Sequence, residues 1–114
     1  MQDKRKLKRN VMQYSLEIHD TGTDEVAGWL VDINAEGLKI SGDHMFDKNR
    51  RLELTIMLPE EISGKTTIPF TAKVRWCRHE ANQQLTATGL QFEKISTEDY
   101  ETLVGFMTQY AMMT

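Results

Sequence analysis

Alternating apolar and polar residues in three separate segments constrain the fold of this 114-residue chain more than any other feature. The apolar members are Met12, Tyr14, Leu16 and Ile18 in the first segment, Leu52, Leu54, Ile56 and Leu58 in the second, and Phe70, Ala72, Val74 and Trp76 in the third. A period of two is typical of β-strands that bury one face. With further strands expected in residues 29–33, 38–40 and 85–92, the sequence predicts a mainly all-β fold. The expected architecture is a six-stranded antiparallel β-barrel over residues 11–93, or a strongly bent sheet.

The centre of the chain, residues 28–42 (GWLVDINAEGLKISG), predicts a β-hairpin, because two short apolar runs flank the turn-forming segment 34–37. Asp32 and Asn34 have the same strand parity and are expected to point to the same side. Gly37 allows a positive φ or the close approach of another molecule. The hairpin therefore predicts a small polar platform, although the same residues also serve as turn caps that bind nothing.

The connections and the C-terminus carry their own signals. Residues 20–25 predict a turn, and Pro59 is expected to end the strand at residues 52–58, with residues 60–67 in a loop. Residues 96–112 predict an amphipathic helix that opens with a capping-box variant formed by Ser96 and Asp99. Its apolar positions are Tyr100, Leu103, Val104, Met107, Tyr110 and Ala111. We expect this helix to cover an open end or face of the barrel.

The first ten residues form a basic arm that is too polar to bury a core and is expected to be mobile. Five basic side chains and Asp3 give the first nine residues a charge of +4, which leaves −7 for the remainder of a chain whose net charge is −3. A basic arm on an acidic body favours a local anionic partner, or a solvated tail. Binding of single-stranded nucleic acid is not expected, because the body is acidic and most of the few aromatic residues follow core-facing patterns.

Other classes of function find little support in the sequence. The length fits one domain over residues 1–114, and no apolar run approaches the ~18 residues of a membrane span. No secretory signal is recognised and Cys77 is the single cysteine, so a cytoplasmic protein is expected. Three dispersed histidines, and the absence of a nucleophile motif or a phosphate-binding loop, predict no metal site, no cofactor and no catalysis.

Two motifs of this chain resemble those of the PilZ family, bacterial domains that bind the second messenger cyclic di-GMP. The family pattern R-x-x-x-R appears in residues 5–9 (RKLKR), and [D/N]-x-S-x-x-G appears in residues 32–37 (DINAEG), with Asn34 where the family usually has serine. The segments 74–76 (VRW) and 89–92 (GLQF) and the helix opening near Ser96 are also similar to the family. The resemblance covers nearly the whole chain.

This resemblance implies a non-enzymatic receptor in which the arm wraps cyclic di-GMP against the hairpin. The implied ligand-binding residues are Arg5, Arg9, Asp32, Asn34 and Gly37, with Lys4 and Trp76 as further candidates. Trp76 also fits core packing, which its place in the alternation favours. Ligand binding would change the conformation and regulate an unidentified protein partner in motility, biofilm or pilus function. The alternative is a PilZ-like protein-interaction scaffold that no longer binds nucleotide.

Overall fold

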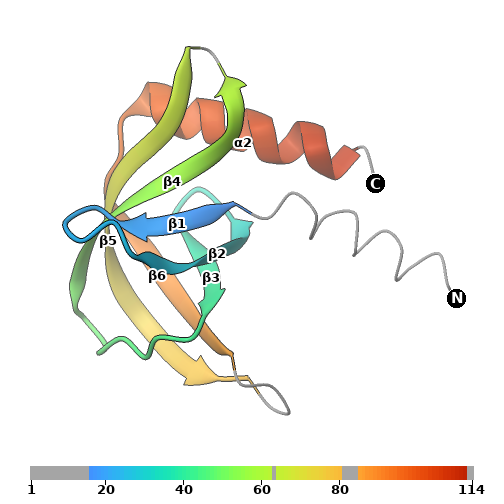
Figure 1. Ribbon diagram of the computed structural model, residues 1–114. Helices are drawn as coiled ribbons and strands as arrows, with labels where there is room; N and C mark the ends of the chain where they lie inside the picture. The colour runs from blue at the N-terminus through green and yellow to red at the C-terminus, as the bar shows by residue number, and fades with distance from the viewer. Residues whose placement is uncertain (1–15, 63, 81–84, 113–114) are drawn as a thin grey trace, which may run out of the picture.

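Six antiparallel strands close into a barrel, and one helix follows them (Figure 1). The computed structural model describes residues 16–62, 64–80 and 85–112, with side chains to residue 108. The elements are β1 (Glu17–Asp20), β2 (Val26–Ile33), β3 (Gly37–Gly42), β4 (Arg51–Ile62), β5 (Lys65–His79), β6 (Thr86–Lys94) and α2 (Thr97–Met112). Around the barrel the strands run in the order β1-β2-β3-β6-β5-β4, and β4 pairs with β1 to close it. The predicted barrel and the turn at residues 20–25 are confirmed.

The alternating residues form the core of the barrel, as the sequence predicts. The buried set includes Leu16, Ile18, Leu52, Leu54, Ile56, Leu58, Phe70, Ala72 and Val74, joined by Leu30, Leu38, Ile40 and Leu90 from β2, β3 and β6. Met12 and Tyr14 lie outside the described residues. Because each strand contributes one apolar face, closing the sheet removes all of these side chains from water at once.

The hairpin that joins β4 and β5 is longer than the sequence predicts. β4 continues through Pro59 to Ile62, and β5 begins at Lys65, so the predicted loop at residues 60–67 is wrong. Within the described residues, β1 pairs with β4 from Leu54 to Ile56. Pro59 lies beyond these pairs, in the part of the β4–β5 ladder that is irregular, between Met57 and Ile62. A proline is tolerated there because no regular ladder bond needs its missing N–H.

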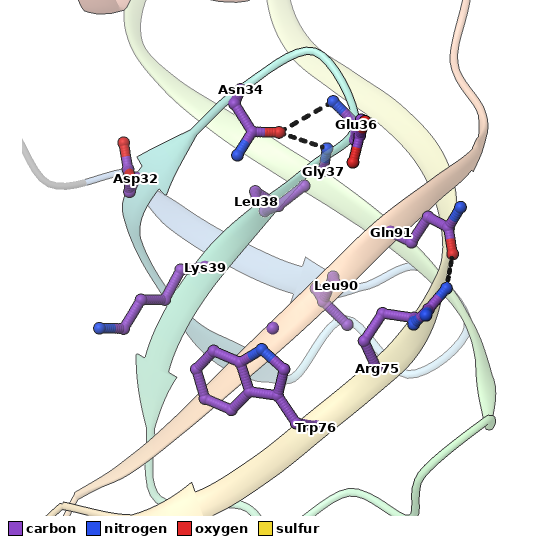
Figure 2. A pocket seen from close by; sticks show the side chains of 11 residues that line it. Asp32, Asn34, Glu36, Gly37, Leu38, Lys39, Arg75, Trp76, Leu90 and Gln91 are labelled. Atoms are coloured by element: carbon purple, nitrogen blue, oxygen red, sulfur yellow. Dashed lines mark hydrogen bonds between the residues drawn. The ribbon is translucent and has the colours of Figure 1, made fainter.

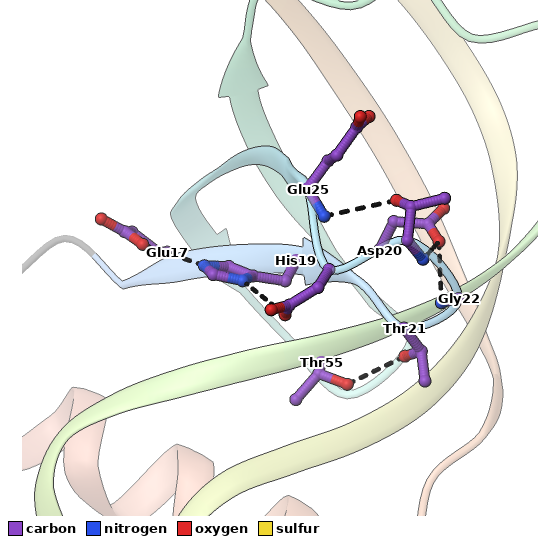
Figure 3. A network of polar contacts seen from close by, with 9 residues as sticks. Glu17, His19, Asp20, Thr21, Gly22, Glu25 and Thr55 are labelled. Atoms are coloured by element: carbon purple, nitrogen blue, oxygen red, sulfur yellow. Dashed lines mark hydrogen bonds and ion pairs between the residues drawn. The ribbon is translucent and has the colours of Figure 1, made fainter.

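A network of short polar contacts holds the turn between β1 and β2 (Figure 3). The Asp20 carboxylate accepts hydrogen bonds from the backbone N–H groups of Gly22 and Thr23, and Thr21 bonds Thr55 of β4 through their hydroxyls at 2.8 Å. His19 lies between two carboxylates, with Nε2 2.9 Å from Glu17 Oε1 and Nδ1 3.2 Å from Asp24 Oδ1. Both carboxylates raise the pKa of His19, that of Glu17 most.

The helix α2 begins where its capping residues predict and packs on the barrel. Ser96 Oγ accepts a hydrogen bond from the backbone N–H of Asp99 at 3.0 Å, which confirms Ser96 as the cap, whereas the Asp99 side chain contacts Lys65 and not the Ser96 N–H. Leu103 and Phe106 are buried in the core, while Tyr100 meets Phe92 of β6 edge-on. The sequence pattern missed Phe106, and the side chains of Tyr110 and Ala111 lie outside those described. The helix thus covers part of the barrel core, as predicted.

An ion pair ties the first turn of α2 to the start of β5. Lys65 Nζ lies 3.1 Å from Asp99 Oδ1, an oxygen that no other polar group contacts, and this carboxylate raises the pKa of Lys65. Asp99 also lies near the helix N-terminus, where the helix dipole favours a negative charge. Asp99 therefore stabilises the N-terminus of α2 and also ties α2 to the β4–β5 hairpin.

Candidate ligand-binding groove

A polar groove of about 350 Å³ lies on the outside of the barrel, over β3, β6 and β5 and beside the β2–β3 turn (Figure 2). Its lining comprises Asp32, Asn34, Glu36, Gly37, Leu38, Lys39, Arg75, Trp76, Gly89, Leu90 and Gln91. The structure therefore brings together four residues singled out from the sequence: Asp32, Asn34, Gly37 and Trp76. Lys4, Arg5 and Arg9 lie outside the described residues.

Asn34 forms the turn at one end of the groove. Its side-chain Oδ1 accepts hydrogen bonds from the N–H groups of Glu36 at 2.8 Å and Gly37 at 3.1 Å, and its own N–H bonds the Gly37 carbonyl. The amide oxygen thus caps the turn, as a serine hydroxyl oxygen can. These bonds use only the amide oxygen, so the NH₂ group of Asn34 can still donate hydrogen bonds to another molecule.

A shift in strand register places Asp32 at the groove, and not the regular alternation with Asn34 that the sequence predicts. The β2–β3 register shifts between Leu30 and Asp32, and β2 ends at Ile33, so Asn34 belongs to the turn and not to the strand. Asp32 is exposed, and its Oδ1 accepts a hydrogen bond from the Ile33 N–H at 2.8 Å. This hydrogen bond uses one carboxylate oxygen, so the other oxygen of Asp32 can accept a hydrogen bond from a ligand.

Gly37 has a role different from the two considered from the sequence. Among the described glycines only Gly64 has a positive φ, so Gly37 is not a left-handed turn residue. The close approach that it permits is to the backbone of β6 in the same chain, where a Cβ would collide with the Leu90 carbonyl. Gly37 therefore sets the spacing between the turn and β6 at the floor of the groove.

Trp76 lies on the outer surface, so the prediction that it packs in the core is wrong. The β5–β6 register shifts between Val74, which pairs with Leu90, and Trp76, which pairs with Gly89. This β-bulge inserts Arg75 and reverses the side on which the following residues point. The indole is 37% exposed. Trp29 of β2, the other tryptophan in an apolar run, is also exposed, at 41%.

The groove also contains charged residues that the sequence analysis did not single out. Arg75, on the bulge, donates a hydrogen bond from Nη1 to Gln91 Oε1 of β6, and Lys39 of β3 lines the same groove. Asp32 and Glu36 line it near the turn (Figure 2). The groove thus has carboxylates at the turn and cations along β3 and β5. Its alternation with the inward Val74 was the available signal for Arg75, and the bulge adds Trp76 to the same side.

Two further findings concern metal binding and membrane crossing in the described part of the chain. Within residues 16–62, 64–80 and 85–112, no group of three or more His, Cys, Asp or Glu side chains is arranged to hold a metal ion. In the same part of the chain, the helix lacks the length and apolar character that crossing a bilayer requires.

A closed six-stranded barrel followed by a helix, with a groove beside the β2–β3 turn, defines a class of small β-barrel domains. The chain belongs to the PilZ domain family, whose family model matches residues 3–109. The search of curated proteins found no match for this chain. The family assignment therefore rests on the family model and agrees with the fold.

Two solved structures share this fold. The Bacillus subtilis inhibitor of motility (MotI/DgrA) matches with a TM-score of 0.70 and 20% sequence identity, covering 88% of this chain and 48% of its own. The Borreliella burgdorferi PlzA protein, solved in complex with c-di-GMP, matches with a TM-score of 0.55 and 11% identity, covering 96% of this chain and 57% of its own. The present chain thus spans about half the length of each of these proteins.

Proposed function

We propose that this protein is a cyclic di-GMP receptor that binds the nucleotide in the groove between the β2–β3 turn and Trp76. The observation that carries the proposal is the convergence in one groove of an exposed indole, carboxylates and cations, in a domain of the PilZ family. The structural likeness to PlzA, which was solved with c-di-GMP, supports the same ligand class. The role is binding and not catalysis.

Each part of the ligand has a matching group. A guanine has N1–H and N2–H donors, which suit the acceptor oxygens of Asp32, and a π-face that can stack on Trp76. The phosphodiester groups suit the cations, since arginine and lysine form charge-assisted hydrogen bonds with phosphate oxygens. Lys39 and Arg75 supply such cations from the barrel itself. The groove therefore matches a ligand that combines guanines with phosphates.

Asn34 is compatible with this role. Its oxygen already caps the turn, as shown by its two backbone donors, while its NH₂ group can donate to a ligand oxygen. The replacement of the family serine thus keeps both an internal acceptor and an outward donor. We expect the exchange to change affinity without abolishing binding.

The basic arm completes the proposed site. The Leu30 N–H bonds the Leu16 carbonyl at 2.8 Å, so the chain enters the barrel beside β2, two residues before Asp32. Arg9 precedes Leu16 by seven residues, a reach of up to about 25 Å. Arg5 and Arg9, with Lys4 as a weaker contributor, can therefore meet the ligand over the groove.

Energetics limit how much of the arm takes part. Ordering ten residues would cost on the order of 10 to 20 kcal/mol, whereas each charged hydrogen bond returns about 1.5 to 3 kcal/mol. We therefore propose that residues 5–10 order on binding and the first residues do not. The ordered arm would change the charge of this face and so its affinity for a protein partner. A role in motility is one candidate, given the likeness to MotI/DgrA.

Titration calorimetry with cyclic di-GMP tests the proposal, with GTP and cyclic di-AMP as controls. Binding at micromolar or lower Kd that is specific for cyclic di-GMP is expected, and Arg5→Ala and Arg9→Ala should each weaken it. Wild-type affinity in both arginine variants would refute the arm clamp. No heat and no change in amide spectra at high ligand concentration would favour the nucleotide-free scaffold and direct the search to its protein partner.

A further inference from the structure

Arg78 lies next to the proposed stacking residue and contacts it. The Arg78 guanidinium carbon is 4.6 Å from the centroid of the Trp76 ring, a cation–π geometry. Both residues are on β5, two positions apart, so their side chains leave the same side of the strand. Their partners on β6 are Gly89 for Trp76 and Ala87 for Arg78. The contact is therefore a feature of the outer face of the sheet.

The strand β6 occupies one face of the indole. A Cβ on Gly89 would lie 2.3 Å from Nε1 and 2.4 Å from Cε2 of Trp76, so the ring rests on the glycine backbone. Only one face then remains for another group. We infer that the Arg78 guanidinium covers this remaining face.

We propose that Arg78 is a displaceable cover of the Trp76 stacking face and lowers the affinity of the groove for a base. This inference rests on the proposed function, since it concerns the regulation of the same site. A base and a guanidinium both need the open face of the indole and cannot occupy the same area of it together. An exposed cation–π contact corresponds to about a two- to fivefold factor in an equilibrium constant. The nucleotide must overcome this factor before it can stack.

Acrylamide quenching tests the cover without any nucleotide. The chain has two tryptophans, so a Trp29→Phe protein reports on Trp76 alone. In that background Arg78→Ala should increase the quenching constant of Trp76. Lys94→Ala, which removes an exposed charge at the last residue of β6, should leave it unchanged. Equal quenching with and without Arg78 overturns the proposal.

Calorimetry tests the displacement. At about 0.5 M salt the Debye length falls to about 4 Å, so the general attraction between Arg78 and the phosphates is largely screened. Under these conditions Arg78→Ala should bind cyclic di-GMP two- to fivefold more tightly than wild type, and Lys94→Ala should bind like wild type. Unchanged or weaker binding by Arg78→Ala overturns the proposal. A wild-type protein that binds no cyclic di-GMP overturns the proposed function, and quenching then still decides whether Arg78 covers the indole.

Discussion

The Cα of Gly37 lies so close to the carbonyl of Leu90 that a Cβ built on the glycine would be 1.9 Å from the carbonyl oxygen and 2.9 Å from its carbon. The obstacle is the backbone of β6, a strand paired with β3 on one side and β5 on the other, which cannot turn aside as a flexible side chain can. Gly37 pairs with Gln91 in the β3–β6 ladder, so any movement would also disturb the hydrogen bonds of the groove floor.

We therefore expect Gly37→Ala to destabilise the protein by at least the 1–3 kcal/mol typical of overpacking. Urea unfolding monitored by circular dichroism measures this change. Gly105→Ala is the matched control, because nothing lies within 4 Å of a Cβ at that exposed helical position. There, alanine should stabilise the protein by about 0.5–1 kcal/mol. Equal midpoints for the two variants would contradict the close-approach argument.

Replacement of Trp76 should affect ligand binding. Base stacking on an aromatic side chain is worth about 1–3 kcal/mol per base, so Trp76→Ala should weaken cyclic di-GMP binding roughly 5- to 150-fold. Trp29→Ala removes an indole of similar exposure outside the groove lining and should keep the affinity. Titration calorimetry of the three proteins decides the point. Equal losses in both variants would show that the effect is not specific to the groove.

Asp32 should set the choice of base. Guanine offers N1–H and N2–H donors to a carboxylate, whereas adenine has an unprotonated N1 on that edge. We therefore expect Asp32→Ala to reduce the preference for cyclic di-GMP over cyclic di-AMP, measured as the ratio of the two Kd values. Glu36→Ala removes a second carboxylate of the groove and is the charge-matched control. A preserved ratio in Asp32→Ala would remove Asp32 from the base-reading role.

His19 should make stability depend on pH. Its contacts with Glu17 and Asp24 raise its pKa above the ordinary value of 6.5, so the folded protein holds this proton more tightly than the unfolded chain. The resulting stabilisation is fully present below pH 6.5 and is lost as pH rises through the folded pKa. Because Glu17 and Asp24 are 51% and 88% exposed, the effect should lie within the range of about 0.2–1 kcal/mol for surface pairs.

Urea unfolding between pH 5.5 and 8.5 measures this dependence. His19→Gln should flatten the profile, while His79→Gln, at the far end of β5, should keep it. A profile that His19→Gln leaves unchanged would assign the pH dependence to other groups.

The helix cap gives a prediction for stability alone. Ser96→Ala removes the acceptor for the Asp99 N–H and should cost about 0.5–2 kcal/mol, and Ser96→Asp should recover most of it. Thr97→Ala, at the next position, should have a much smaller effect. Chemical denaturation separates the variants, and equal losses at positions 96 and 97 would argue against the cap.

The barrel could be predicted because its signals are local. Alternation marked residues such as Leu54 and Ile56, and the spacing from Ser96 to Asp99 marked the start of the helix, since each pattern depends only on residues nearby in the chain. The extent of β4 past Pro59 depends instead on its pairing with β5, where Ile62 faces Lys65, which is a property of the partner strand.

The groove could be predicted only in part for the same reason. Asp32, Asn34 and Gly37 lie close together in residues 32–37, so they could be recognised as one motif in the sequence. Trp76 enters the groove because of a bulge in the β5–β6 ladder, and Arg75, Lys39 and Gln91 enter because of how β5, β3 and β6 pair. Register between distant strands is set by the packing of the whole barrel, so a local pattern cannot specify it.

The bulge at Arg75 makes the outer face of β5 a matter of chain length as much as of residue type. Deleting this single residue would make the ladder regular and still leave Trp76 opposite Gly89 and Cys77 opposite Thr88, so the indole would stay outside and Cys77 would stay packed against the core. The loss of one codon would therefore remove the Arg75 cation from the groove and leave the stacking surface in place. Among related barrels, a strand that is one residue shorter at this position would therefore keep the exposed indole and lose the bulged cation.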